Sequence, residues 1–216
     1  AVYVNYDGRN SVVLQTPDLD IPFDTGSYYE SGPDGGKWAI KVSLRGHDSD
    51  DKMKNLHDKL VELDELILAE AKKNSFAWFK KKNMSDEMIE NLYTPQVKVS
   101  VDKETGEPNG RFPPNFTFKI SKYDGKVQCD CYDGNEKPVK KMNVENEDEE
   151  DFVMLGAPYD PDNHEGLFKG GTKVKVIMKC FGLWFSASGF GVKWNATQMR
   201  VKAQQQNENY SFLDDS

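Results

Sequence analysis

The sequence predicts a mainly β fold, a β-barrel with one helical insert, and three observations predict it. Apolar and polar residues alternate with a period of two in six segments, which is the pattern of strands with one buried face. After the first of these segments, apolar residues recur at helical spacing and indicate the insert. The 216 residues show neither a regular strand–helix alternation nor an internal repeat. Short strands around one helical region are typical of small barrels.

The N-terminal part begins with short strands. Residues 2–14 have the pattern of two short strands around the turn Asp7–Asn10. Residues 15–36 are rich in Pro, Gly and Asp, so we expect a long loop there. In residues 37–45, apolar side chains alternate with Lys, Ser and Arg, which predicts a strand.

The helical insert is expected at about residues 49–93. One apolar stripe predicts a helix over 49–74, and residues 48–51 supply its cap. Ser85 is the expected cap of a second helix over 85–92. The stripe of the first helix consists of Met53, Leu56, Leu60, Leu63, Ile67 and Ala71.

A three-stranded meander is expected after the insert. Alternating valines predict a strand at 96–101, and similar alternation predicts strands at 116–122 and 126–132. The pair Asp124–Gly125 is a two-residue hairpin signal between the last two.

The segment 172–202 predicts the longest hairpin of the fold. In its first half, apolar residues alternate with three lysines and an isoleucine; in its second half, the apolar parity changes near Asn195–Ala196, which predicts a β-bulge. These strands suffice for a five-stranded oligonucleotide-binding (OB) fold with extra N-terminal strands and long loops. We expect one domain over 1–203 and a flexible polar or acidic tail over 204–216.

Charges are segregated between the strands and the segments that connect them. The chain has a net charge of −8, yet the six predicted strands hold 13 basic residues and a single acid, Asp130, among 53 residues. The other 163 residues hold 15 basic and 35 acidic residues. In five strands the basic residues occupy the parity opposite the core set. They are therefore expected on the outer face, either as solvated or edge-guarding side chains or as a ligand-binding surface.

A basic face with aromatic residues suits single-stranded nucleic acid, because lysines follow the phosphates and aromatic rings stack on unpaired bases. The expected phosphate contacts are Lys41, Arg45, Lys119, Lys173, Lys175, Lys179, Lys193, Arg200 and Lys202. The expected stacking platforms, for which burial in the core is the alternative, are Phe181, Trp184, Phe185 and Trp194, with Tyr123 and Tyr132 as further candidates. Core positions by parity are Trp38, Phe116 and Phe118.

No catalytic or metal-binding pattern stands out, so we expect neither an enzyme nor a cofactor or metal. The histidines His47, His57 and His164 are far apart and lack ligand spacing. Cys129 and Cys131 are expected as small buried residues, and an odd cysteine count favours a reducing intracellular compartment. No stretch has the length and hydrophobicity of a membrane span or a secretory signal, so no membrane association is expected.

Four short motifs occur in order along the chain: Thr16-Pro17, Ile21-Pro22-Phe23, Phe190-Gly191-Val192-Lys193-Trp194 and Phe212-Leu213-Asp214-Asp215. Together with the helical insert they resemble the phage-type single-stranded DNA-binding proteins of large DNA viruses, the chlorovirus and mimivirus kind. The resemblance implies an OB fold and a role in viral DNA replication, recombination and repair.

In that family an acidic C-terminal tail that ends in an aromatic residue occupies the DNA groove and recruits replication proteins. The resemblance implies this role here for Tyr210, Phe212, Asp214 and Asp215. The sequence departs from the pattern, because it ends in Ser216. The acidic run 145–151 is either a competitor for the basic face or a solvated loop.

The sequence thus predicts a non-enzymatic, sequence-independent single-stranded DNA-binding protein, for which a homodimer is one compatible assembly. The alternative is a protein-interaction or structural component of a replication complex or virion that binds no nucleic acid, in which the hairpin aromatics form an interface. Binding of an oligothymidylate distinguishes the two.

Overall fold

A computed structural model describes residues 1–5, 7–23, 27–30, 36–124, 126–132 and 170–202. The acidic run 145–151, His164 and the tail residues Tyr210, Phe212, Asp214 and Asp215 lie outside the described residues. Their predicted roles, and the boundary between domain and tail, stay predictions.

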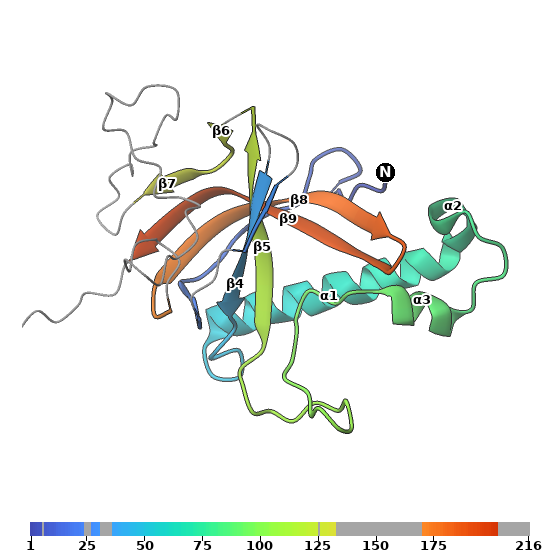
Figure 1. Cartoon of the computed structure of the whole chain (residues 1–216), viewed down its shortest axis with the longest axis horizontal. Coiled ribbons are helices and arrows are strands. Elements are labelled where there is room, and N and C mark those ends of the chain that lie inside the picture. The colour runs from blue at the N-terminus through green and yellow to red at the C-terminus, as the bar shows by residue number, and fades with distance from the viewer. Residues whose placement is uncertain (6, 24–26, 31–35, 125, 133–169, 203–216) are drawn as a thin grey trace, which may run out of the picture.

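The described part is mainly β and contains one mixed sheet. Its strands are β1 (Val13–Gln15), β2 (Leu19–Asp20), β3 (Ser27–Glu30), β4 (Gly36–Ser43), β5 (Asn115–Tyr123), β6 (Lys126–Val127), β7 (Asp130–Tyr132), β8 (Lys173–Ser186) and β9 (Gly189–Lys202). Neighbouring strands in the sheet follow the order β1-β8-β2-β4-β5-β9-β7. In addition, β3 pairs with β4 and β6 pairs with β5. Because β8 also pairs with β9, the pairings run from β8 through β2, β4, β5 and β9 back to β8. Figure 1 shows β4 and β5 crossing the long β8–β9 hairpin.

Three helices form the insert between β4 and β5, and α1 lies along the sheet (Figure 1). They are α1 (Asp51–Lys73), α2 (Ser75–Phe79) and α3 (Asp86–Leu92). The Asp50 side chain accepts the Met53 backbone N–H at 2.8 Å and so caps α1. Ser85 caps α3 through the Met88 N–H at 3.2 Å. The two predicted helices and their caps are confirmed, whereas α2 was not predicted.

The main core lies between the sheet and the apolar stripe of α1. Ile40, Phe118, Val176 and Met178 are fully buried on the inner face, and Leu60 of α1 is fully buried against them. The predicted core residues Trp38, Phe116 and Phe118 are confirmed, as is the burial of Cys129 and Cys131. A second core cluster, formed by Ile67, Ala71, Ile89, Tyr93 and Phe190, joins the helices to the end of the hairpin.

A buried polar network ties α1 to β9. The Asp64 carboxylate accepts hydrogen bonds from the Tyr93 hydroxyl, from the Gln96 backbone N–H at 2.9 Å and from Gln96 Nε2 at 2.7 Å. Gln96 Oε1 accepts in turn from the Trp194 indole N–H. Burial raises the pKa of Asp64, while its hydrogen bonds act in the opposite direction. Each of the polar atoms named here has a hydrogen-bond partner. A polar network can be buried in a core without a large cost only when its atoms are paired in this way.

The β-bulge predicted near Asn195–Ala196 is confirmed one residue further on. Met178 pairs with Ala196, whereas Ile177 pairs with Gln198, so Thr197 is the extra residue. The bulge explains why the apolar parity changes along β9.

Several predicted strands are wrong. Residues 96–101 form only the single bridges Lys98–Asn115 and Val101–Pro108, because Val99 and Val101 are about half exposed and find no sheet face to cover. Of the residues described between 2 and 14, only Asn5 and Ser11, which form one bridge, and the start of β1 take part in strand pairing.

The expected loop 15–36 contains the short strands β2 and β3. The expected meander also breaks after β6, because β7 leaves β5 and pairs in parallel with β9.

Candidate nucleic-acid interface

The outer face of β8 and β9 carries the predicted basic residues. Register places Lys173 opposite Lys202, Lys175 opposite Arg200 and Lys179 opposite Asn195. Between them on β8, Val174, Val176, Met178 and Cys180 are buried. The alternation therefore points the lysines away from the core, as the sequence predicts.

A second bulge shapes the upper part of this face. Between the pairs Cys180–Trp194 and Leu183–Val192, the two residues Phe181 and Gly182 lie opposite the single residue Lys193. Gly182 has a φ of 95°, and a Cβ at this position would lie 2.2 Å from the carbonyl oxygen of Val2. Only glycine fits this position without displacing the N-terminal segment.

This bulge sets the Phe181 ring between two lysines. Lys179 Nζ lies 5.6 Å and Lys193 Nζ 5.7 Å from the ring centroid, within the range of cation–π interactions. The ring is 46% exposed, so it still offers surface to a ligand. A base stacked on Phe181 would therefore have two positive charges close by for its phosphates.

Two further lysines extend this group across the sheet. Lys119 of β5 lies opposite Asn195 of β9 and opposite Ala39 of β4, and it is half-buried. Burial lowers the pKa of Lys119, and the neighbouring charges of Lys37 and Lys193 lower it further. We call the residues Lys37, Lys119, Lys179, Phe181 and Lys193 the lysine–phenylalanine cluster.

The four lysines of this cluster form no ion pair with an acidic side chain of the described ranges. Like charges held together without counterions cost free energy, and an anion placed among them lowers that cost. The arrangement is therefore suited to binding phosphate groups.

The lowered pKa of Lys119 gives a pH dependence whose sign can be worked out. A bound phosphate favours the charged lysine, so binding takes up a proton wherever the free lysine is partly deprotonated. Affinity for an oligothymidylate is expected to fall as pH rises towards 10.5, because the lowered pKa places the deprotonation of Lys119 below that of an ordinary lysine. In K119R the guanidinium stays charged, so the affinity should change less over this range.

Fluorescence anisotropy titrations at constant ionic strength, for the parent chain and K119R, measure both slopes. Equal slopes would show that Lys119 does not titrate on binding.

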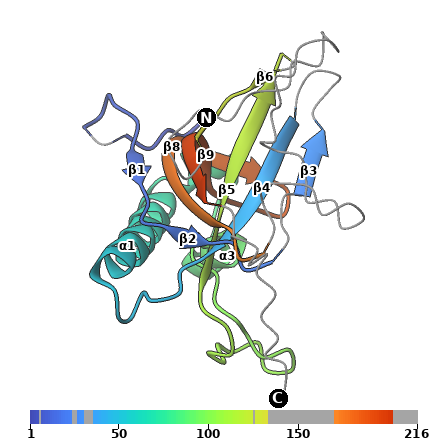
Figure 2. The same cartoon turned by 90° about the vertical axis from the view of Figure 1, so that its left-hand side faces the viewer.

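The other end of the face is partly neutralised by two aspartates, Asp18 between β1 and β2 and Asp20 at the end of β2. Asp18 lies 3.3 Å from Lys202 and 3.9 Å from Lys175, and Asp20 lies 3.7 Å from Lys173. Figure 2 shows β1 and β2 beside β8, which explains the proximity. These predicted phosphate contacts already have carboxylate partners, which a nucleic acid would have to replace.

A hollow of about 470 Å³ lies beside these lysines on the outer face. It is lined by Gln15, Tyr132, Lys175, Ile177, Gln198, Met199 and Arg200. Tyr132 reaches this site because β7 pairs with β9 and sets it opposite Arg200. The hollow thus combines a tyrosine with two basic residues, and Tyr132 is a candidate stacking residue here.

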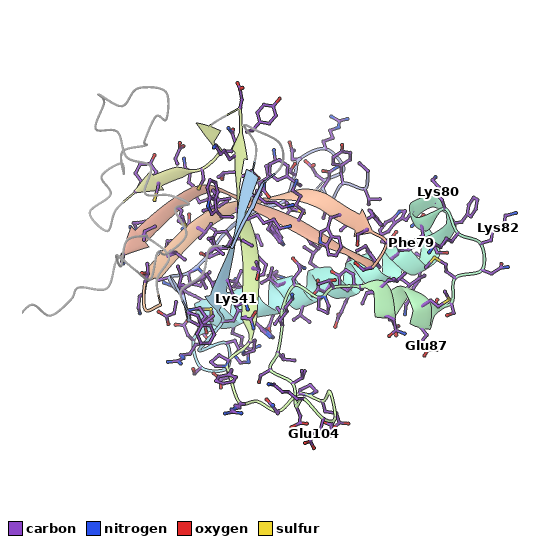
Figure 3. The ribbon with its side chains drawn as sticks, viewed as in Figure 1. Lys41, Phe79, Lys80, Lys82, Glu87 and Glu104 are labelled. Carbon is purple, nitrogen blue, oxygen red and sulfur yellow. The ribbon has the colours of Figure 1, made fainter. Side chains whose placement is uncertain are left out.

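Lys41 and Arg45 are exposed but lie apart from the cluster. Lys41 is opposite Thr117, two positions along β4 from the pair that holds Lys119, and it is labelled in Figure 3. Arg45 follows the end of β4. The charges that act on the pKa of Lys119 are those of Lys37 and Lys193.

The prediction that Trp194 is a stacking platform is wrong. It is only 2% exposed, and its indole N–H is used by Gln96. The reason is that Trp194 pairs with Cys180, whose side chain is also buried, so both lie on the inner side of the sheet.

Phe185 is packed at the end of the hairpin, where its ring lies parallel to that of Phe190 with centroids 5.7 Å apart. Trp184 is half-buried opposite Gly191, and Tyr123 is exposed at the end of β5. Of the four main stacking candidates, Phe181 alone lies within the lysine–phenylalanine cluster.

Three residues of the interface were not among the predicted site residues. Lys37 belongs to a predicted strand, but its place beside Lys119 follows from the β4–β5 register. Asp18 and Asp20 lie in a segment expected to be a loop. The alternation of Lys37 with Trp38 was the available signal for the first, and no local signal pointed to the aspartates.

The histidines are not all far apart, which corrects the sequence-based expectation. The rings of His47 and His57 have centroids 4.8 Å apart, and His57 Nδ1 lies 3.0 Å from Asp58 Oδ1. The described ranges contain no group of three or more His, Cys, Asp or Glu side chains placed to hold a metal ion. None of the described helices combines the length and hydrophobicity needed to cross a membrane.

Comparisons with known proteins give the following findings. Residues 162–214 match a family of unknown function, DUF5871. No curated protein matches the chain. Among solved structures, the chain is similar to gp2.5, a single-stranded DNA-binding protein encoded by bacteriophage T7, with a TM-score of 0.49 and 14% identity over 93% of this chain and 91% of the other.

The chain is also similar to a single-stranded DNA-binding protein from bacteriophage Enc34. The C-terminally truncated form has a TM-score of 0.43 and 13% identity over 90% of this chain and 87% of the other. The form in complex with ssDNA has a TM-score of 0.42 and 14% identity over 92% and 89% of the two chains.

Proposed function

We propose that this chain is a non-enzymatic protein that binds single-stranded DNA without sequence preference. The observation that carries the proposal is the lysine–phenylalanine cluster, in which two lysines lie against one exposed ring and two more extend the group across the sheet, all four without acidic partners in the described part. Lysines held in this way attract phosphates of any sequence, and a phenyl ring stacks on any base.

The proposed path of the strand follows the outer face of β8 and β9. It runs from the lysine–phenylalanine cluster to the hollow at Tyr132 and Arg200. From Phe181 to Lys173 the path is eight residues of extended chain, or about 26 Å. That length suits a few nucleotides, within the site sizes of about 4–16 nucleotides found for OB folds.

The strand pairings return to the strand from which they start, because β8 pairs with both β2 and β9. This closure supports the further proposal that β2, β4, β5, β9 and β8 form an OB-type barrel. We further propose a single domain with the tail after residue 203, and a role in viral DNA replication, recombination and repair. The proposed site of action is a reducing intracellular compartment, and the tail is proposed to recruit replication proteins. These proposals rest on the sequence and on its resemblance to the viral family.

A titration of fluorescein-labelled oligothymidylate of about 20 nucleotides tests the binding function. We expect saturable binding at 50 mM salt that weakens as salt rises, with a slope of about −0.7 per phosphate contacted. A duplex of equal length should bind more weakly, because its bases are not available for stacking. No change in anisotropy at low salt would reject DNA binding and favour the interaction or structural component.

Phe181→Ala is expected to weaken oligothymidylate binding by about 5- to 150-fold, because one stacked base contributes roughly 1–3 kcal/mol. The slope of affinity against salt should stay nearly the same, since no charge is removed. Anisotropy titrations at several salt concentrations measure both quantities.

Phe112→Ala is the matched control for F181A. Phe112 is 56% exposed and also has a cation over its ring, Arg111 at 5.4 Å, but it lies in the segment between α3 and β5. Its substitution should leave the affinity unchanged. Equal losses in both variants would remove Phe181 from the proposed site.

A further inference from the structure

A second pocket lies at the far end of the β8–β9 hairpin, where the strands meet α2 and α3 (Figure 1). It has a volume of about 360 Å³. Its apolar walls come from all of these elements and from the segments beside them: Trp78, Phe79, Met84, Leu92, Phe185 and Phe190. We call it the tip pocket. It is separate from the lysine–phenylalanine cluster and from the hollow at Tyr132.

The walls of the tip pocket are held by contacts between aromatic rings. Phe185 stacks on Phe190 with 7° between the ring planes, and Phe79 meets both rings edge-on at 5.7 and 5.0 Å. Phe190 is fully buried, whereas Phe185 is 39% exposed. The rings are thus fixed by one another, and the pocket is already formed without an occupant.

Three consecutive lysines follow α2 beside the tip pocket. Lys81 lines the pocket, and its sequence neighbours Lys80 and Lys82 are exposed and labelled beside α2 in Figure 3. None of the three forms an ion pair with an acidic side chain in the ranges that the structure describes. The rim therefore carries a concentrated positive charge.

Of the three acids on α3, Asp86 and Glu90 are paired elsewhere, whereas Glu87 forms no ion pair within the described ranges. Lys72 lies 2.5 Å from Glu90 and 3.7 Å from Asp86, so those two carboxylates are paired with α1. Against the three lysines, α3 thus sets one acid that is not already paired, Glu87. An occupant that complements this rim carries acidic groups.

The chemistry of the walls favours an apolar side chain over a nucleotide base. The one hydroxyl among the wall residues, Ser186 Oγ, lies 3.2 Å from the Gly189 carbonyl and 3.1 Å from Ser188 Oγ. A base carries several polar edge groups, which would lose their hydrogen bonds to water in this pocket. A phenylalanine or leucine side chain loses none.

We propose that the tip pocket docks a short peptide segment of a partner protein in which one or two large apolar side chains are flanked by acidic residues. The apolar side chain fills the space between Phe185 and α2, and the carboxylates meet Lys80, Lys81 and Lys82. This interaction is independent of the proposed binding of DNA.

A fluorescein-labelled peptide of sequence Gly-Asp-Asp-Phe-Leu-Asp-Asp-Gly serves as the probe. It is titrated with the full chain and with the full-chain variant F212S, which removes an apolar side chain of the chain's own C-terminal segment. Two control peptides replace the four aspartates by lysines or the Phe-Leu pair by Ser-Ser. We expect both controls to bind at least tenfold more weakly than the probe, because each lacks one of the two complementary features.

The variants K80E/K82E and F185A should each weaken binding of the probe at least tenfold. K80E/K82E changes only exposed side chains, so it remains informative if F185A disturbs packing at the hairpin end. Both variants should retain oligothymidylate binding. Equal binding of the three peptides, or no loss in K80E/K82E, would overturn the proposal.

Two other outcomes would name a different occupant and also overturn it. Displacement of the probe by oligothymidylate, together with loss of DNA binding in F185A, would assign the tip pocket to nucleic acid. Binding of the probe to F212S but not to the parent chain would assign the pocket to the chain's own C-terminal segment.

Discussion

Reversing two charges in the lysine–phenylalanine cluster, K119E/K193E, is expected to weaken oligothymidylate binding by on the order of 100-fold at 50 mM salt. The two residues lie on neighbouring strands that pair in parallel, and the charge of Lys193 acts on Lys119. Their reversal removes two phosphate contacts and places carboxylates among the remaining lysines. The slope of log affinity against log salt should become shallower by about 1.4, since each contact contributes about 0.7.

The matched control is K98E/K103E, which changes the net charge of the chain equally. Lys98 and Lys103 are exposed in the segment between α3 and β5, away from the face of β8 and β9. This control should weaken binding only slightly through long-range charge. Circular dichroism checks that both variants fold. If both variants lost affinity equally, net charge rather than the cluster would govern binding.

Asp64→Ala is expected to lower the free energy of unfolding by about 3–5 kcal/mol. The Asp64 carboxylate accepts from the Tyr93 hydroxyl and from two N–H groups of Gln96, all in the buried network between α1 and β9. Alanine leaves these donors without a partner and away from water, which costs more than the loss of one exposed hydrogen bond. Urea unfolding followed by circular dichroism measures the change.

Two variants sharpen the interpretation of D64A. In Asp64→Asn an amide NH₂ group replaces one carboxylate oxygen and faces a donor of the network. The other oxygen still accepts, so we expect the free energy of unfolding to fall by a smaller amount, about 1–3 kcal/mol. Asp58→Ala removes an exposed ion pair with Lys54 on the same helix, and it should cost less than about 1 kcal/mol. A loss in D64A no greater than that in D58A would show that the network does not stabilise the fold.

Local signals in the sequence were sufficient for the parts of the fold that depend on near neighbours. The helices α1 and α3 were predicted because their caps, Asp50 and Ser85, act within three residues. The outward lysines of β8 were predicted because alternation along one strand sets which face each residue occupies. The expected β-bulge also followed from a change in parity along β9 alone.

The remaining features depend on contacts between distant segments. The lysine–phenylalanine cluster forms only because β5 pairs in parallel with β9, which brings Lys119 beside Lys193. The burial of Trp194 depends on its pairing with Cys180 of β8 and on Gln96, which is 98 residues away. The valines at 99 and 101 follow the same alternation as a true strand, yet they have no sheet to join. Periodicity shows which residues share a face, but it does not show which strands are neighbours.

The position of β8 determines when the fold can be completed. It pairs with β1 and β2 from the beginning of the chain and with β9 from near the end of the described part. The Thr16 hydroxyl accepts the Val176 N–H at 2.9 Å across 160 residues of sequence. Such non-local pairs form slowly, because closing a long loop costs entropy before the contacts repay it. During synthesis, β2, β4 and β5 leave the ribosome well before β8, and their edges stay unpaired until the C-terminal hairpin has emerged. The closing strands of the sheet are also those that carry the basic face, so a nascent chain acquires its structure and its proposed binding surface in the same late step.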